Sequence, residues 1–360
     1  MPTNFPKTAL EDAPSPAALS LAAGTYGDGR GLCDLRRALD GVWHVGRTYP
    51  AAPNASFSAF SARHRLHYIV EENAVGRVGV HRHDDNGWEK ITVVPAGGAA
   101  PCHVALDPSE TLLAVANYAG GSIALLRLDP KTGLPFGDPQ VHANRGSGPD
   151  VERQGAPHAH WVGFSPDGHW LYQTDLGTDQ VLAFAIAGDG TLGMPRIAYT
   201  APSGAGPRHL LLHPRRGNRA YLANELANTL TTLDRHEDAT FAAKATLSTL
   251  PTGWHGESIL AHLAINAAGT RLYVSNRGHD SIAVFALDAD GVPTLLEHVA
   301  SGGASPRFFL LLETAGVMVV AHERAQTVTA LAIAADGRLT PTDVVLQIPG
   351  VGYVLDTDPS

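Results

Sequence analysis

The sequence predicts an all-β protein, a seven-bladed β-propeller of four-stranded antiparallel blades that its C-terminal strand closes into a ring. Three observations predict this fold. A pattern of short strands separated by turns recurs seven times at intervals near 50 residues, and Gly and Pro lie between its short apolar runs. The leading strand that is missing before the first repeat is present after the last one. Repeats of about 50 residues that hold about four short strands are typical of propeller blades.

The second strand of each repeat ends at an equivalent position, and successive positions lie 46 to 58 residues apart. These positions are Thr25, Glu71, Asn117, Asp175, Asn224, Asn276 and His322. The apolar segments around them are rich in Val, Leu, Ile and Tyr and are separated by turn sequences such as SPDG and NAAG. A helical solenoid would need an amphipathic period of about 3.6 residues, which is missing. A β-sandwich with accidental internal similarity is the alternative that this pattern leaves open.

The two ends of the chain complement each other. Six repeats have their own leading strand, whereas the repeat that ends at Thr25 has none. Residues 348–356 have the form of a leading strand, and we expect them to complete the blade that begins near Leu21, which removes an exposed sheet edge. We therefore expect one propeller domain over residues 19–360, preceded by a disordered arm over residues 1–18.

Composition excludes several classes of partner. The formal net charge is −9 with both signs interspersed, so no basic stripe is available for a nucleic acid or an anionic membrane surface. No apolar run is long enough to span a membrane. The two cysteines, Cys33 and Cys102, form neither a disulfide framework nor a metal knuckle, which fits a cytoplasmic location. Because a propeller buries its own core, we expect a monomer.

Two sets of positions are expected to meet at one mouth of the central channel. Consecutive strands in a blade are antiparallel, so the start of the leading strand and the end of the second strand lie at the same end of the blade. The first set is Cys102, His160, Arg208, Ala261 and Arg307; the second set is Tyr26, Glu72, Tyr118, Leu176, Glu225, Arg277 and Glu323. Together they hold an acid/base and anion-binding group.

From these sets we predict the catalytic residues His160, Arg208, Glu225 and Arg277, with Glu72 and Arg307 as substrate-binding residues and Glu323 at the rim. The longest interval contains a Gly/Pro-rich insert, residues 129–157, that we expect to lie over the mouth as a binding loop; a solvated excursion is the alternative. Arg153 and His158 are its expected contributions to substrate binding. The substrate is expected to be a small anionic molecule.

Histidines elsewhere are expected to be structural. The register next to the first set holds His103, Trp161, His209, His262 and Phe308, and we expect these side chains to point between blades and to be hydrogen-bonded there. His213, His279 and residues 81–83 are expected in turns or at the surface. The HAH sequence at 158–160 offers two imidazoles but no third ligand, and nearby arginines oppose a cation. We therefore predict no metal and no cofactor.

Several phrases in this chain resemble the lactonase family of seven-bladed propellers, which includes propeller-type 6-phosphogluconolactonases and fungal carboxymuconate cyclases. The resemblance runs from about Leu21 to Tyr353. The phrases are GTY, PCHVALDP, ANYAGGSIALL, GSGPDVERQGAPHAH, FSPDG with TDLGTD, GPRHLLLHP, ANEL and SNRGHDSIAVF. The resemblance implies a metal-independent active site of one His, two Arg and one Glu, which falls on His160, Arg208, Glu225 and Arg277. The chain departs from the family at YIVEEN and at PRFF, which lacks the His of PRHL.

The resulting hypothesis is a lactone hydrolase that acts on a sugar-acid lactone, with 6-phosphogluconolactone as the first choice of substrate. The arginines would stabilise the oxyanion, His160 would take a proton from water, and Glu225 would orient a neighbour or protonate the leaving alkoxide. The runner-up is a lactonising enzyme of the 3-carboxy-cis,cis-muconate cyclase type. A non-catalytic binding propeller is the third possibility, although no Trp-Asp dipeptide closes any blade.

Overall fold

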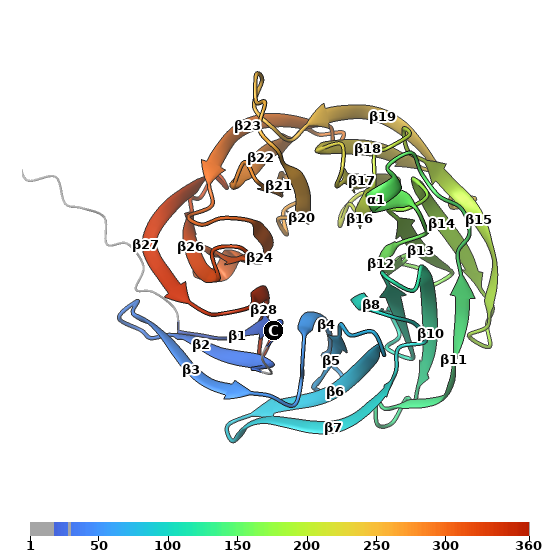
Figure 1. Ribbon diagram of the computed structural model, residues 1–360, viewed down its shortest axis with the longest axis horizontal. Helices are drawn as coiled ribbons and strands as arrows, with labels where there is room; N and C mark the ends of the chain where they lie inside the picture. The colour runs from blue at the N-terminus through green and yellow to red at the C-terminus, as the bar shows by residue number, and fades with distance from the viewer. Residues whose placement is uncertain (1–17, 28–29, 360) are drawn as a thin grey trace, which may run out of the picture.

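The computed structural model describes residues 18–27 and 30–359, which form a ring of seven four-stranded antiparallel sheets (Figure 1). The predicted seven-bladed propeller is therefore confirmed. The expected arm over residues 1–18 lies, apart from Ala18, outside the described residues. No helix in the described ranges is both long and apolar enough to cross a membrane.

The blades are numbered from the one that contains the first strand. Blade 1 is β28 (Val351–Asp356), β1 (Leu19–Thr25), β2 (Leu32–Arg37) and β3 (Trp43–Tyr49). Blade 2 is β4 (Ala55–Ser61), β5 (Leu66–Glu71), β6 (Arg77–Asp84) and β7 (Gly87–Pro95). Blade 3 is β8 (Pro101–Leu106), β9 (Leu112–Asn117), β10 (Ser122–Leu128) and β11 (Pro135–Ala143). Blade 4 is β12 (Ala159–Phe164), β13 (Trp170–Asp175), β14 (Gln180–Ile186) and β15 (Leu192–Thr200).

The remaining blades follow the same order from the channel outwards. Blade 5 is β16 (Pro207–Leu212), β17 (Arg219–Asn224), β18 (Thr229–Arg235) and β19 (Phe241–Ser248). Blade 6 is β20 (Ile259–Ile265), β21 (Arg271–Arg277), β22 (Ser281–Leu287) and β23 (Pro293–Ala300). Blade 7 is β24 (Pro306–Leu312), β25 (Val317–His322), β26 (Thr327–Ile333) and β27 (Leu339–Gln347), with a short 3-10 turn, η1 (Glu313–Ala315), between β24 and β25.

The ring closes as the sequence predicts. The C-terminal strand β28 pairs antiparallel with β1, with Ala23 opposite Val354, so blade 1 takes its leading strand from the end of the chain. The Thr357 hydroxyl also donates to the carbonyl of Ser20 at 2.8 Å. The two ends of the chain thus hold each other in one sheet, and β28 covers the inner edge of β1.

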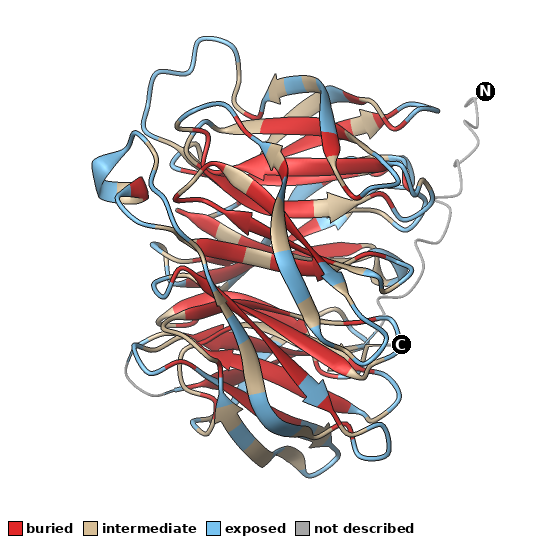
Figure 2. Ribbon diagram, turned by 90° about the vertical axis from the view of Figure 1, so that its right-hand side faces the viewer, coloured by how far each residue is buried: buried red, intermediate tan, exposed pale blue. Residues whose placement is uncertain are grey.

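The core lies between neighbouring blades. The second and third strands of each blade are largely buried and the outermost strands are largely exposed (Figure 2), as expected when twisted sheets pack face to face around an axis. Equivalent buried tyrosines on the second strands donate to a carbonyl in a turn of the next blade. These pairs are Tyr68 with Gly133, Tyr221 with Gly291 and Tyr273 with Gly337, at 2.6, 2.6 and 2.8 Å. Each such contact satisfies a buried hydroxyl and fixes the angle between two blades.

The expected insert over residues 129–157 is shorter than the sequence suggested. Its first part contains β11, an ordinary outermost strand of blade 3. Only the segment after Ala143 leaves the sheet, and it carries the one α-helix of the described chain, α1 (Val151–Gln154), over blades 4 and 5 (Figure 1). The error arose because the Gly and Pro residues around β11 resemble a loop in sequence.

The predicted orientation of the register next to the site is wrong. Each leading strand contributes one aromatic or imidazole side chain to a layer in the channel: Phe57, His103, Trp161, His209, His262, Phe308 and Tyr353. The ring centroids of His103 and His209 lie 5.6 Å apart although blades 3 and 5 are not neighbours. Among the described residues, Nδ1 of His103 and Nδ1 of His262 have no hydrogen-bond partner. These side chains therefore contact one another across the axis and do not bond between blades.

Of the histidines expected in turns or at the surface, His81 lies in a strand and is buried, and His213 opens a turn as expected but is buried as well. His81 is fully buried in β6, where its Nδ1 lies 3.2 Å from the Tyr49 hydroxyl and burial lowers its pKa to about 3. His213 is also buried and lies 3.2 Å from the Gly269 carbonyl. His81 is buried because alternation along β6 directs its side chain towards the interface with blade 1, where Tyr49 lies.

Candidate active site

A β-bulge at the start of each leading strand builds the inner wall of the site. In blade 5, Pro207 pairs with Asn224 and His209 pairs with Ala223, which leaves Arg208 as an extra residue. Equivalent register shifts leave His160 unpaired in blade 4 and Arg307 unpaired in blade 7. A bulge interrupts the alternation of side chains, so two successive residues can face the channel. This explains both the site and the aromatic layer directly next to it.

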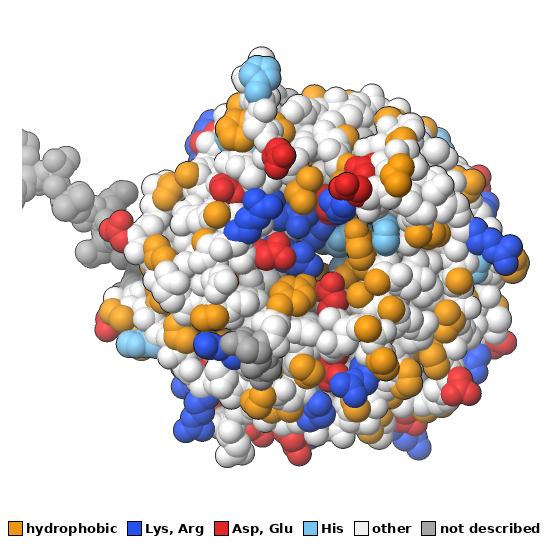
Figure 3. All heavy atoms as spheres, viewed as in Figure 1, with side chains coloured by type: hydrophobic (Ala, Val, Ile, Leu, Met, Phe, Trp, Pro, Cys, Tyr) orange, Lys and Arg blue, Asp and Glu red, His pale blue; other side chains and the backbone are white. Residues whose placement is uncertain are grey.

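The second wall comes from the residues that end or follow the second strands. Glu72 follows β5, Tyr118 follows β9, Glu225 follows β17, and Arg277 ends β21. With the bulge residues they surround a cavity of about 170 Å³ at one mouth of the channel. Its lining is Glu72, Cys102, Tyr118, Arg153, His160, Arg208, Glu225, Arg277 and Arg307. Figure 3 shows acidic and basic side chains gathered around this central hollow.

Glu225 is the hub of one half of the cavity. Its side chain is 2 % exposed, and its Oε1 accepts from Nη2 of Arg153 at 2.6 Å. Its Oε2 accepts a short hydrogen bond from Nη1 of Arg208 and lies 3.1 Å from Nη2 of Arg277. One carboxylate therefore holds three guanidinium groups, which come from blades 5 and 6 and from the insert.

His160 completes this half as a hydrogen-bond acceptor. Nη1 of Arg208 lies 2.7 Å from Nε2 of His160 and donates to it, because a guanidinium has only donors. Nε2 is therefore unprotonated, and the ring proton lies on Nδ1, which is 3.9 Å from the Cys102 sulfur. Burial lowers the pKa of His160 well below its usual range, and the charge of Arg208 lowers it further. The imidazole is neutral at neutral pH.

The same charges fix the state of the carboxylate. Burial by itself raises the pKa of Glu225, but Arg208 and Arg277 outweigh it and hold the pKa well below its usual range. Burial also lowers the pKa of Arg277 to about 10, which still leaves its guanidinium charged at pH 7. The site thus combines a permanent anion, permanent cations and a neutral imidazole.

The opposite half of the cavity is built by blades 1, 2 and 7. The Tyr26 hydroxyl donates to Oε2 of Glu72 at 2.8 Å and accepts from Nη2 of Arg307 at 2.8 Å. Glu323, which follows β25, lies 3.6 Å from Nη1 of Arg307 and 3.9 Å from Nη1 of Arg277. Tyr26 and Glu323 belong to the second set of positions predicted from the sequence. The pairing of Tyr26 with Glu72 was not predicted, because a register does not state which neighbour a side chain contacts.

The insert brings Arg153 to the cavity and is firmly anchored. Asp150 caps α1 by accepting from the backbone N–H groups of Glu152 and Arg153. Gln154 is fully buried, and its Nε2 donates to the Leu176 carbonyl and to Oδ1 of Asp179, both at 2.8 Å. These bonds fix the helix beside blade 4 and aim the Arg153 guanidinium at Glu225.

Seven of the eight predicted site residues line the cavity, and His158 does not. Its ring stacks on Tyr118 with centroids 4.4 Å apart, and its Nδ1 lies 3.0 Å from the Tyr118 carbonyl. His158 thus supports Tyr118, which itself lines the cavity and whose role the sequence did not indicate. Cys102, which belongs to the first set of positions predicted from the sequence, lines the cavity as well. Burial raises the pKa of its thiol far above the usual range.

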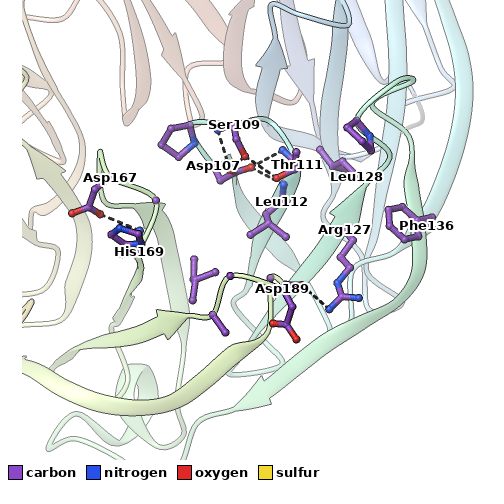
Figure 4. A pocket seen from close by; sticks show the side chains of 17 residues that line it. Asp107, Ser109, Thr111, Leu112, Arg127, Leu128, Phe136, Asp167, His169 and Asp189 are labelled. Atoms are coloured by element: carbon purple, nitrogen blue, oxygen red, sulfur yellow. Dashed lines mark hydrogen bonds between the residues drawn. The ribbon is translucent and has the colours of Figure 1, made fainter.

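A larger cavity of about 540 Å³ lies at the other end of blades 3 and 4 (Figure 4). Its polar side chains bond within their own turns or to backbone: Asp107 accepts from Thr111 and Leu112, and Arg127 donates to the carbonyl of Asp189 at 3.0 Å. The polar side chains of this cavity therefore stabilise its turns and do not form a cluster of catalytic groups. In the described ranges, no group of three or more His, Cys, Asp or Glu is arranged to hold a metal ion.

The fold and the cavity define an all-β propeller with an arginine-rich cavity at one mouth of its channel. The chain matches the family described as lactonase, 7-bladed beta-propeller, over residues 21–355, and it belongs to that family.

Relatives and solved structures agree with this assignment. The chain is 33% identical to an uncharacterised protein of Lactococcus lactis over 283 residues, 78% of this chain and 81% of that protein. It is 31% identical to a protein of Bacillus subtilis named 6-phosphogluconolactonase over 276 residues, 75% of this chain and 77% of that protein. A periplasmic gluconolactonase of Pseudomonas aeruginosa superposes with a TM-score of 0.84 at 26% identity, covering 94% of this chain and 98% of the other.

Proposed function

We propose that the protein hydrolyses the lactone of a sugar acid at the cavity around Glu225. The observation that carries the proposal is the arrangement of two buried arginines and a neutral imidazole around one carboxylate, in a propeller of the lactonase family. An ester carbonyl placed between Arg208 and Arg277 would meet fixed cationic donors where negative charge develops in the transition state. Such preorganised donors are typically worth about 10²- to 10³-fold in rate each.

His160 is the proposed general base. Its Nε2 lone pair accepts from Arg208, so the base becomes available when the substrate carbonyl draws that guanidinium towards its own oxygen. A water molecule then gives a proton to Nε2 as its oxygen bonds to the carbonyl carbon. Collapse of the tetrahedral intermediate breaks the ring C–O bond, and the imidazolium returns the proton to the leaving alkoxide.

Glu225 acts as a positioning residue in this scheme. Because its pKa is held well below the usual range, it carries no proton for the leaving alkoxide at neutral pH. Of the two roles considered from sequence, orientation of its neighbours is the one that its contacts support. It keeps three guanidiniums close together that would otherwise repel one another.

The first substrates to test are 6-phosphogluconolactone, for which a relative is named, and gluconolactone, for which a structural neighbour is named. Acid release is measured in a pH-stat near pH 6.5, with and without EDTA. We expect hydrolysis well above the buffer rate, no effect of EDTA, and a loss of about 10²-fold or more in His160→Ala. Turnover of a carboxymuconate alone, or full activity in His160→Ala, would contradict the proposal.

A further inference from the structure

Four side chains on the half of the cavity away from His160 take no part in the proposed chemistry. We call Tyr26, Glu72, Arg307 and Glu323 the far cluster. They come from blades 1, 2 and 7, whereas the catalytic group comes from blades 4, 5 and 6. Glu72 and Arg307 line the same cavity as the catalytic group. A bound substrate that fills the cavity therefore contacts both halves.

The far cluster is built into the fold. The Arg307 guanidinium lies 5.3 Å from the centre of the Tyr26 ring and donates to the Tyr26 hydroxyl, which in turn donates to Glu72. Gly352, the bulge residue of blade 1, makes room for this arrangement. A Cβ there would lie 2.5 Å from the Tyr26 ring and 3.3 Å from the Arg307 side chain. The geometry of the far cluster is thus fixed before substrate arrives.

The two halves carry opposite charge. Around His160, three guanidiniums surround the single carboxylate of Glu225, so that half is cationic. In the far cluster, Arg307 is the one cation. Beside it are the carboxylate of Glu72, which lines the cavity, and that of Glu323, which stands at the rim with its side chain 40% exposed and also lies 3.9 Å from Nη1 of Arg277. With both carboxylates counted, that half is anionic. The side chains of Glu72 and Arg307 are each 17% exposed, which limits screening by solvent.

We propose that Glu72 and Glu323 are specificity-determining residues that select a lactone with a neutral, hydroxylated tail over the same lactone with a terminal phosphate. This inference rests on the proposed lactone hydrolysis. A carbonyl held by Arg208 and Arg277 directs the rest of the molecule towards the far cluster, because both halves line one cavity. A dianionic phosphate there would meet Glu72 in the cavity and Glu323 at its rim, against the single guanidinium of Arg307, which is an unfavourable arrangement of like charges.

A hydroxylated tail fits the far cluster better. Oε2 of Glu72 is engaged by Tyr26, whereas Oε1 has no hydrogen-bond donor among the described residues. It is free to accept from a sugar hydroxyl, and such a bond to a charged acceptor is stronger than one to a neutral acceptor. The cationic half, in contrast, suits the carboxylate that hydrolysis produces.

The test compares kcat/KM for gluconolactone and 6-phosphogluconolactone in the parent protein and in Glu72→Gln and Glu323→Gln. We expect the parent to favour gluconolactone by about tenfold or more. Glu72→Gln should raise the relative kcat/KM of the phosphorylated lactone by about tenfold, and Glu323→Gln should raise it by less, because the Glu323 side chain is 40% exposed and solvent screens its charge. Glu237→Gln, the same change at an exposed turn, should leave the ratio unchanged. A parent that prefers the phosphorylated lactone, or a ratio that neither variant shifts, would overturn the inference and leave lactone hydrolysis intact.

A binding measurement separates this inference from the proposed function. Calorimetric titration with gluconate and with 6-phosphogluconate should show tighter binding of gluconate in the parent and a smaller difference in Glu72→Gln. If neither lactone is hydrolysed above the buffer rate, the proposed function fails. Tighter binding of 6-phosphogluconate by the parent overturns the selectivity, whatever the rates show.

Discussion

Neutralising Glu225 is the perturbation whose effect can be worked out most fully. Glu225→Gln keeps the size of the side chain and one acceptor oxygen but removes the charge that three guanidiniums share. Removing one partner from a buried ion pair costs about 3–5 kcal/mol because the remaining charge stays buried. Since the amide still accepts one hydrogen bond, we expect the lower end, about 3 kcal/mol.

That cost is measurable as a shift in the melting temperature. An entropy of unfolding of about 2.1 cal/mol/K per residue gives about 0.75 kcal/mol/K for a chain of 360 residues. A loss of 3 kcal/mol therefore lowers Tm by about 4 °C. Activity should fall further than stability, by about 10²-fold or more in kcat/KM, because Arg208 and Arg277 lose the anchor that aims them. Scanning calorimetry and the pH-stat assay measure the two effects on one sample.

The control is Glu237→Gln, which makes the same chemical change at an exposed turn and should alter neither quantity. Phosphate or citrate should raise the Tm of Glu225→Gln more than that of the parent, since an added anion can replace the missing charge. A variant with the Tm, the activity and the anion response of the parent would refute the electrostatic reasoning.

Three further predictions follow from individual contacts. Because the pKa of His160 lies well below its usual range, kcat/KM should stay level from pH 7.5 to about pH 6, and a decline centred near pH 6.5 would argue against His160 as the base. Gln154→Ala removes the bonds that fix α1, so KM should rise by about tenfold with little change in kcat as Arg153 loses its aim; equal effects on both would indicate a general fault in folding. The folded-state pKa of His81 is about 3 and its unfolded value about 6.5, so the unfolded chain binds the proton first on acidification. The free energy of unfolding should then decrease below pH 6.5 by up to about 1.4 kcal/mol per pH unit for this group. Denaturant titrations at several pH values should show that the unfolding free energy of His81→Phe falls less steeply with decreasing pH than that of the parent.

The sequence predicted the ring, its closure and the convergence of the site because a propeller repeats one register. Once the strand phrase is aligned, antiparallel order places His160, Arg208, Glu225 and Arg277 at one mouth, whatever the details of packing. The Thr25 repeat lacked a leading strand, and that single gap was enough to assign β28 to blade 1. The catalytic roles of His160, Arg208, Glu225 and Arg277 are predictions that the variants described above test.

What escaped prediction depends on local geometry. Strict alternation along a strand sends His209 away from the channel if Arg208 faces it, but the bulge turns both inwards. The fact that His158 supports Tyr118 and does not line the cavity depends on a stacking contact, which no spacing rule encodes. Hydrogen-bond choices such as Arg208 to Nε2 of His160 likewise follow from positions in space and not from residue type.

The most direct measurement is a crystal structure of the protein with bound gluconate, the acid that hydrolysis of gluconolactone would release. Its carboxylate should lie within hydrogen-bond distance of Arg208 and Arg277, with the hydroxylated tail directed towards Glu72. Gluconate at the opposite mouth, or in the cavity between blades 3 and 4, would contradict the assignment of the site.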